Sequence, residues 1–287
     1  MSIVTRQHII TGLQALGIDS GMRLMVHSSL ASFGQVQGGA TTVIESLQMV
    51  LTEQGTLLMP SFCHGEPFLE DSLGYFDPVS TPTSNGAIPD TFWRMDGVYR
   101  SVSPTHAFAA WGHDAKRYTQ NHHRTLTLGV DSPLGKLWRD GGSGLLIGVD
   151  YTVNSFHHVV ETVTGSPCLR QRAVRRRVRL PEGRFVEGRT IAWRRAPCPI
   201  NDSGSYAELM ERQGLQRQVK VGLSVLTCFK LQDCFELVAE LLRDGFKGRP
   251  SCCCCPIRPR EYPDDGVSSD WDQTQQRLVP QSPSFEY

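Results

Sequence analysis

The sequence has no excess of charge of either sign, because 29 Lys and Arg residues balance 29 Asp and Glu residues. A neutral chain creates no overall field that attracts nucleic acid or anionic lipid. The chain also lacks an apolar run long enough to span a bilayer. Its N-terminus lacks the basic stretch followed by an apolar stretch that marks a signal peptide. These absences predict a cytoplasmic protein that binds neither nucleic acid nor membrane.

The nine cysteines do not show the spacing of a metal site or of a disulfide framework. In a cytoplasmic protein they are expected to be free thiols. Four of them are adjacent, Cys252 to Cys255, and lack the C-x₂-C spacing with which thiolates converge on zinc. We therefore expect no metal, and we expect His122 and His123 on a loop surface. A non-catalytic metal-binding or redox interaction protein, acting through the Cys-rich tail, remains the alternative from another class.

The composition is that of a globular protein, with 39% hydrophobic and 20% charged residues in 287. Helical and strand patterns continue to about residue 248. Beyond it, prolines, adjacent cysteines and a QTQQ run are typical of a poorly ordered tail. We predict one domain over residues 1–248 and a tail over residues 249–287.

Alternating strands and helices in the first half predict an α/β fold. An amphipathic helix in the first 18 residues is followed by a strand at 23–26, a helix at 41–51 and a strand at 56–59. Residues 60–100 are rich in Pro, Gly, Ser and Asp, with only a short helix expected at 90–94. A loop of this length inside a domain is more often functional than a bland surface excursion.

The second half adds a strand, a hairpin and three helices to this pattern. A buried strand is expected at 145–149 and a helix at 154–163. Two alternating runs between residues 172 and 193 flank Pro181-Glu182-Gly183, which indicates a β-hairpin. Further helices are expected at 203–213 and 232–244. The predicted fold is a central mixed sheet flanked by helices, with a β-hairpin insertion.

The segment from Leu145 to Glu161 carries the most informative chemistry. Ser155 is a good N-cap for the helix after the strand, and His158 then lies in its first turn. Glu161 lies three residues further along, on the same face, where a carboxylate can orient an imidazole. This geometry suits a general base, although a packed structural histidine fits the spacing equally well. His157 points about 100° away on a helix, so only one of the two histidines can face Glu161.

Together, blocks along residues 5–245 resemble the aminoglycoside 3-N-acetyltransferases, a family distinct from the GNAT fold. The pattern around the helix is Gly148, Asn154-Ser155, His158 and Glu161. Each block alone is weak evidence for the family, but the occurrence of all the blocks in the family's order is specific. In chain order they are His27-Ser28-Ser29-Leu30, Gly34, Gly38-Gly39-Ala40, Gly55-Thr56-Leu57, Met59-Pro60, Phe76-Asp77-Pro78, Thr81-Pro82, Asn85-Gly86, Arg100-Ser101, Pro104, Ala109-Ala110-Trp111-Gly112, Ser132-Pro133-Leu134-Gly135-Lys136-Leu137 and Val221-Gly222.

This resemblance implies acetyl transfer from acetyl-CoA to an amino group of an aminoglycoside, at the 3-N position. It places the catalytic histidine on His158 and its carboxylate on Glu161. The residues expected to contact the cofactor are His27, Ser28, Ser29, Leu30, Gly39, Ala40, Ser103 and Thr105. The family often has His-Pro after the Arg-Ser pair, whereas this chain has Ser103-Pro104-Thr105-His106.

The acceptor site is expected to be acidic, because aminoglycosides are polycations. The candidates are Glu66, Asp71 and Asp131, and the loop from Cys63 to Asp71 is expected to set acceptor identity. An acetyl-CoA-dependent transferase acting on another amine, such as an amino sugar or a biosynthetic intermediate, is the nearest alternative. The chain is expected to be a monomer or a homodimer.

The expected mechanism is direct transfer, with His158 taking a proton from the amine. Ser155, through its hydroxyl or the nearby backbone N–H groups, is the expected donor to the tetrahedral oxyanion. An acyl-enzyme route through Cys63 and the neighbouring His64 is a less favoured alternative, because adjacent residues in extended chain rarely share a useful hydrogen bond.

Overall fold

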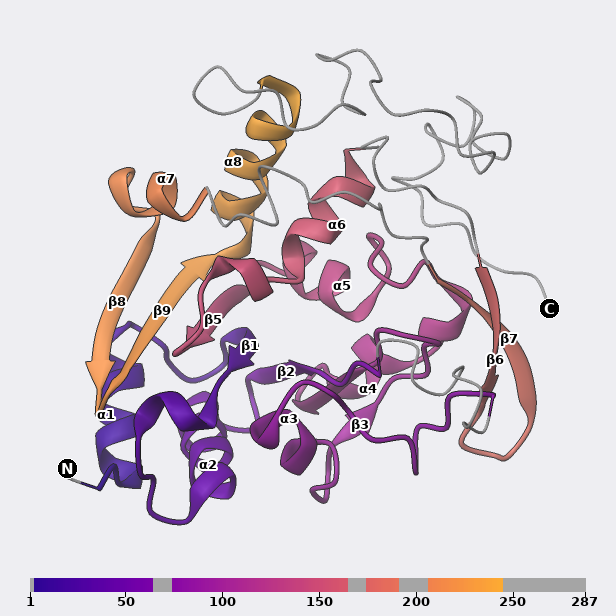
Figure 1. Ribbon diagram of the computed structural model, residues 1–287, viewed down its shortest axis with the longest axis horizontal. Helices are drawn as coiled ribbons and strands as arrows, with labels where there is room; N and C mark the ends of the chain where they lie inside the picture. The colour runs from indigo at the N-terminus through magenta and orange to yellow at the C-terminus, as the bar shows by residue number, and fades with distance from the viewer. Residues whose placement is uncertain (1–2, 64–73, 165–173, 191–205, 245–287) are drawn as a thin grey trace.

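The computed structural model describes residues 3–63, 74–164, 174–190 and 206–244. Its main feature is a seven-stranded mixed sheet with the order β3-β4-β2-β1-β5-β9-β8 (Figure 1). Strand β1 (Arg23–Ser28) lies in the middle and is parallel to both β2 (Thr56–Pro60) and β5 (Ser143–Ile147). The predicted α/β fold with a mixed sheet is confirmed.

Antiparallel strands extend this parallel centre on both sides. Strands β4 (Phe108–Gly112) and β3 (Tyr99–Arg100) follow beyond β2. On the other side β9 (Ser224–Lys230) pairs with β5 and β8 (Gln216–Val221) forms the edge. These four strands were not predicted from the sequence.

Alternate residues of the central strands point to opposite faces of the sheet, as the pleat requires. In β5, Leu145 and Ile147 belong to one core cluster, whereas Leu146 belongs to the other. In β1, Met25 packs on the face opposite to Leu24. Because both faces are apolar, the sheet requires a helical layer on each side.

Helices α1 (Arg6–Ala15), α2 (Gly39–Leu51) and α3 (Ala87–Phe92) cover one face. The other face is covered by α4 (Ala115–Thr119), α5 (Pro133–Arg139), α6 (Phe156–Val163), α7 (Tyr206–Arg212) and α8 (Leu231–Asp244). Figure 1 shows α1 and α2 below the sheet and α6 and α8 above it. Within the described ranges, none of these helices is both long and apolar enough to cross a bilayer.

The predicted hairpin is present as β6 (Val174–Arg179) and β7 (Phe185–Thr190), a separate two-stranded sheet. It projects to one side of the molecule (Figure 1). Val178 joins it to the domain through a bridge to Phe76, and both side chains are fully buried.

The short helix α3 begins three residues earlier than the expected start at residue 90. Pro89 lies in its first turn, where a missing N–H leaves no hydrogen bond broken. Proline disrupts the interior of a helix, but Pro89 is compatible with a helix that starts two residues before it.

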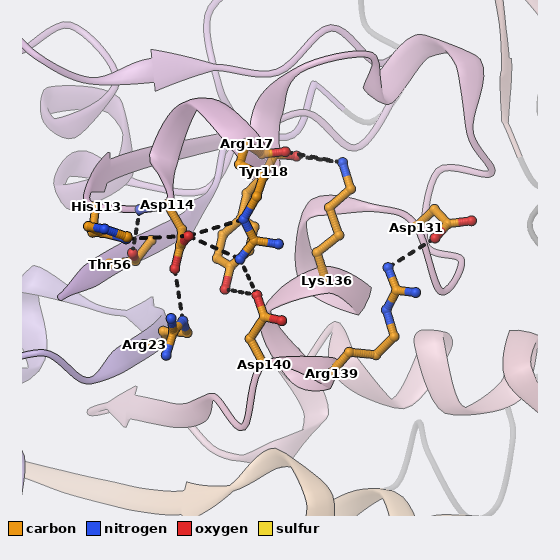
Figure 2. Close-up of polar contacts among 10 residues, drawn as sticks. All are labelled: Arg23, Thr56, His113, Asp114, Arg117, Tyr118, Asp131, Lys136, Arg139 and Asp140. Carbon is orange, nitrogen blue, oxygen red and sulfur yellow. Dashed lines mark hydrogen bonds and ion pairs between the residues drawn. The ribbon is translucent and has the colours of Figure 1, made fainter. Parts of the chain in front are cut away.

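An ion-pair network anchors the amino end of β1 to α4 (Figure 2). Asp114, whose side chain is 8% exposed, accepts hydrogen bonds from Arg23 Nε at 2.9 Å and Arg117 Nε at 3.1 Å. Burial raises the pKa of Asp114, but the two guanidinium groups outweigh it and hold that pKa below its usual range. Tyr118 donates to Asp140 at 2.7 Å, which ties α4 to the end of α5. Arg23 begins β1, so this network lies at the opposite end of the strand from Ser28.

Candidate active site

A pocket of about 490 Å³ lies at the carboxyl ends of the three parallel strands. His27 and Ser28 end β1, Pro60 ends β2, and Val149 follows β5. Helix α6 contributes His158 to the same wall. Open α/β sheets bind ligands at this edge, where the loops after neighbouring strands diverge.

His158 and Glu161 form a hydrogen-bonded pair on α6. Nδ1 of His158 lies 2.7 Å from Oε2 of Glu161. The Glu161 side chain is 0% exposed and that of His158 is 19% exposed. The predicted pairing is therefore confirmed: the carboxylate is sealed beneath the ring, and the ring faces the pocket rather than the core.

Ser155 occupies the N-cap position of α6, as predicted, but its side chain makes no capping hydrogen bond. Its hydroxyl lies 3.0 Å from Nε2 of His27, and its N–H also donates to that nitrogen at 3.3 Å. The Oδ1 of the preceding residue, Asn154, instead accepts from the N–H of Phe156 at 3.2 Å. The hydroxyl of Ser155 thus contacts a histidine 128 residues away rather than the N–H groups of its own helix.

His27 is neutral in this arrangement. Burial lowers the pKa of His27 to about 4, and Nε2 accepts the N–H of Ser155. The ring therefore ties the end of β1 to the start of α6. This contact gives the two central walls of the pocket a fixed spacing.

His157 points away from Glu161, as helical geometry predicted, and its side chain is 2% exposed. Nδ1 of His157 lies 3.4 Å from the hydroxyl of Tyr206 in α7. Its Nε2 lies 3.1 Å from Nε2 of His158, with the two rings at 85°. The side chains therefore touch although their positions on the helix diverge, a contact that helical angles alone do not reveal.

Phe62, Asn85 and His106 also line the pocket, and of these only His106 was considered from the sequence, as a substitute for the histidine that the family often has after the Arg-Ser pair. His106 lies against Phe62, with ring centroids 4.6 Å apart, and its Nδ1 lies 2.7 Å from the hydroxyl of Thr105. Asn85 accepts the N–H of Phe62 at 2.6 Å and so shapes the loop after β2. The Asn85-Gly86 and Ser103 to His106 motifs were the available signals.

Of the residues expected to contact the cofactor, His27 and Ser28 line the pocket. Ser103 is 1% exposed and its hydroxyl accepts the N–H of His106 at 3.4 Å. Thr105 likewise supports His106 from behind. Six are not part of the pocket wall, which are Ser29, Leu30, Gly39, Ala40, Ser103 and Thr105. Cofactor contacts remain predictions for all eight residues.

The expected acidic acceptor residues are not gathered at the pocket by the described part of the chain. Asp131 forms an ion pair with Arg139 at 3.0 Å (Figure 2) and does not line the pocket. Glu66 and Asp71 lie outside the described residues, as do His64 and the tail with Cys252 to Cys255. Cys63 is described and fully buried, and its thiol donates to the carbonyl of Pro104 at 3.2 Å.

The expectation that His122 and His123 lie on a loop surface is wrong. His122 is 1% exposed and His123 is 7% exposed. Nδ1 of His122 lies 2.9 Å from the hydroxyl of Ser101, and Nε2 lies 2.9 Å from the carbonyl of Thr127. With both ring nitrogens bonded, the imidazole is an internal brace between two loops.

Residues 25–243 match the family model described as aminoglycoside 3-N-acetyltransferase. The chain belongs to this family. The expected family and the fold class distinct from GNAT are thereby confirmed, because the solved structures that share the fold are also aminoglycoside acetyltransferases.

Curated members of the family align with much of the chain. The aminoglycoside N(3')-acetyltransferase-like protein YokD of Bacillus subtilis is 36% identical over 175 residues, 55% of this chain and 64% of YokD. An aminoglycoside N(3)-acetyltransferase III of Pseudomonas aeruginosa is 32% identical over 169 residues, 54% of this chain. The chain thus spans 64% and 62% of these two relatives, less than two thirds of each. An aminoglycoside N(3)-acetyltransferase III of Salmonella sp is 32% identical over 230 residues, 75% of this chain and 78% of the relative.

Solved structures of the family share the fold. The YokD crystal structure has a TM-score of 0.74 at 27% identity, over 87% of this chain and 97% of YokD. A mutant of the acetyltransferase AAC(3)-IVa in complex with a gentamicin has a TM-score of 0.72 at 27% identity, over 88% and 95%. The binary complex of AAC-IIIb with CoASH has a TM-score of 0.75 at 22% identity, over 86% and 99%.

Proposed function

We propose that this protein transfers the acetyl group of acetyl-CoA to an amino group of an aminoglycoside, at the 3-N position. The observation that carries the proposal is the pair of His158 and Glu161, with its imidazole at the pocket wall, in a chain of this family. AAC(3)-IVa binds a gentamicin and AAC-IIIb, which shares the fold, binds CoASH. Both ligands are consistent with the proposed reaction.

His158 is the general base in this proposal. The amine of the acceptor attacks the thioester carbonyl, and His158 takes a proton from the attacking nitrogen. An N–C bond forms, the C–S bond breaks, and the proton passes from His158 to the departing thiolate to give free CoA. Glu161 holds the Nδ1–H of the ring, so that the lone pair lies on Nε2. No covalent enzyme intermediate is needed.

Ser28 is the proposed donor to the tetrahedral oxyanion. Its hydroxyl lines the pocket and is buried without a hydrogen-bond partner among the described residues. The sequence-based candidates were the hydroxyl of Ser155 and the backbone N–H groups at the start of α6. That hydroxyl lies 3.0 Å from Nε2 of His27, and the N–H groups of Ser155 and Phe156 donate to His27 and Asn154. The Ser28 hydroxyl, buried at the pocket wall, is the better-placed donor.

The pocket fits the acetyl end of acetyl-CoA, with the bulkier parts of both substrates outside it. Phe62, Val149 and Val153 give it apolar sides, while Ser28 and Ser84 offer hydroxyls. A thioester has an apolar arm and one polar carbonyl, which suits this mixed wall.

A different amine as acceptor is the second candidate, and one observation favours it. None of the described residues that line the pocket is a carboxylate. A polycation is attracted by acidic walls, whereas an amine with a single positive charge does not require them. YokD, the relative at 36% identity, is itself described as acetyltransferase-like.

A thiol-release assay with acetyl-CoA and a panel of amines tests both candidates. The panel contains gentamicin, apramycin, an amino sugar and a buffer without amine, and mass spectrometry reports the acetyl mass shift of the acceptor. We expect turnover with at least one aminoglycoside. Acetylation of the amino sugar alone would keep the transferase and replace the acceptor, and no acetylated product with any amine would refute the proposal.

Matched histidine variants test the base. His158→Ala is expected to lower kcat by about 10²–10⁴-fold, the usual contribution of a positioned general base. His113 is a control, because its side chain is 62% exposed and it does not line the pocket. His113→Ala is expected to retain full turnover. Wild-type rates in His158→Ala would exclude His158 as the base.

A further inference from the structure

His157 is a buried pocket residue to which the proposed reaction gives no role. Its side chain is 2% exposed, yet it reaches the pocket wall beside His158. The Nε2 atoms of the two rings lie 3.1 Å apart. The Nε2 of His158 is the atom that accepts the proton in the proposed reaction. Two uncharged nitrogens at this distance share one hydrogen, so one ring donates to the other.

Tyr206 holds His157 from the other side. The hydroxyl of Tyr206 lies 3.4 Å from Nδ1 of His157, and the ring of Tyr206 is fully buried in α7. Burial raises the pKa of Tyr206 well above its ordinary value, so the phenol keeps its hydrogen. Asn154 donates to the same phenol oxygen at 3.2 Å. His157 is therefore held at both ring nitrogens, between α7 and His158.

The direction of the hydrogen bonds follows once His158 is neutral, as a base at rest must be. The carboxylate of Glu161 requires the hydrogen of His158 on Nδ1, which leaves the lone pair on Nε2. His157 must then donate its Nε2–H to that lone pair. The Nδ1 of His157 faces the hydroxyl of Tyr206, which also donates to the carbonyl of Tyr151 at 3.3 Å. With a neutral His158, these hydrogen bonds run from His157 through His158 to Glu161.

We propose that His157 is a positioning residue for the base, an inference that rests on the function proposed above. Glu161 fixes His158 at Nδ1 and His157 fixes it at Nε2, so the ring has both its tautomer and its orientation set before substrates bind. When the acceptor binds, its amine replaces the N–H of His157 as the hydrogen-bond donor to Nε2 of His158. That nitrogen already carries its lone pair and already lies at the pocket wall. Orientation of this kind lowers the entropy lost in reaching the reactive geometry.

Three substitutions at the 157–206 contact separate positioning from structural support. His157→Leu removes the donor, and His157→Gln keeps an N–H donor of similar reach. Tyr206→Phe removes only the hydroxyl behind His157. We expect kcat to fall about tenfold in His157→Leu and about threefold in Tyr206→Phe, the scale of a small misplacement of a catalytic group. The KM values for both substrates are expected to stay within about twofold, because His157 acts on the base and not on binding.

His157→Gln is expected to recover most of the lost kcat, which a purely structural role does not predict. His123→Leu is the control for burial, since His123 is 7% exposed and does not line the pocket. It is expected to lower the melting temperature without changing kcat. An unchanged or raised kcat in a folded His157→Leu, or a kcat in His157→Gln as low as in His157→Leu, would overturn the positioning role.

A measurement that needs no turnover separates this inference from the proposed function. Proton NMR in water observes ring N–H hydrogens that are protected from solvent exchange. The His158 Nδ1–H, bonded to Glu161 at 2.7 Å, is expected to exchange slowly in the wild type and about tenfold faster in His157→Leu, because the ring is then held at one nitrogen. His157→Gln is expected to restore slow exchange. Equal exchange rates in all three proteins would refute the inference, even if the acetyl transfer were established. Slow exchange restored in His157→Gln, without acetyl transfer in any of the proteins, would refute only the proposed function.

Discussion

Acidification is expected to destabilise the fold through its buried neutral histidines, well before the carboxylates titrate. Burial lowers the pKa of His27 to about 4 and that of His122 to about 3, from 6.5 in a model peptide. Because these folded-state pKa values are depressed, the unfolded chain binds more protons than the folded one below about pH 6.5. The stability present above this pH is therefore lost as the pH falls toward the folded-state values.

The magnitude follows from the interval between the unfolded-state pKa of 6.5 and the chosen pH. At about pH 5 the unfolded histidine is protonated and the folded one is not, and about 1.5 pH units at about 1.36 kcal/mol each is about 2 kcal/mol per histidine. His27 and His122 together give about 4 kcal/mol. Asp114 does not contribute in this range, because its pKa lies below 3.8 and its stability is lost only at lower pH.

Urea unfolding between about pH 7.5 and pH 5, followed by circular dichroism, measures this loss. The variant His122→Gln isolates one histidine. It lowers stability near neutral pH, because the bonds to Ser101 and Thr127 are weakened, but its free energy of unfolding should fall by about 2 kcal/mol less than the wild type on going to about pH 5. Parallel pH dependences in the two proteins, or a wild-type stability that does not change over this interval, would refute the reasoning.

Other substitutions test the network, a glycine and the oxyanion donor. Asp114→Ala leaves Arg23 without its carboxylate and is expected to lower the free energy of unfolding by about 1–3 kcal/mol, measured in urea, with kcat unchanged. Gly148→Ala is expected to cost about 2–4 kcal/mol in the same assay, because φ is +61° and a Cβ would lie 1.8 Å from the hydroxyl oxygen of Ser32. Wild-type stability of either variant would contradict these contacts. Ser28→Ala is expected to lower kcat about 10²-fold in the thiol-release assay with little change in stability, and a kcat near wild type would assign the oxyanion to another donor.

The sequence predicted those elements whose pattern is local. The apolar run of β5 and the three-residue spacing of His158 and Glu161 both depend on neighbours within one strand or one helical turn. Strand β8, QRQVKV, is a polar edge strand in which only Val219 and Val221 pack against the core, and two apolar residues are too few to predict a strand. Helix α5 begins with Pro133 and contains Gly135, two residues that weaken a helical pattern although the first turn tolerates proline.

What the sequence could not predict depends on partners far along the chain. Serine is a typical capping residue, but the hydroxyl of Ser155 bonds to His27 instead of to its own helix. His122 lies in a polar stretch typical of a loop, yet Ser101 and Thr127 make its burial possible. His157 was correctly placed away from Glu161, but its contact with His158 depends on side-chain rotamers and on Tyr206, 49 residues later.

The pocket is built by stretches of chain that are distant in sequence and meet only when β1, β2 and β5 pair. Its walls include His27, Phe62, Asn85, His106 and His158. A molecule that fills this space contacts all of them at once and has no comparable surface to bind in the unfolded chain. Its binding should therefore raise the melting temperature in proportion to the logarithm of its concentration above Kd. Thermal-shift screening with CoA and candidate amines thus reads occupancy of the site directly, without any knowledge of the reaction.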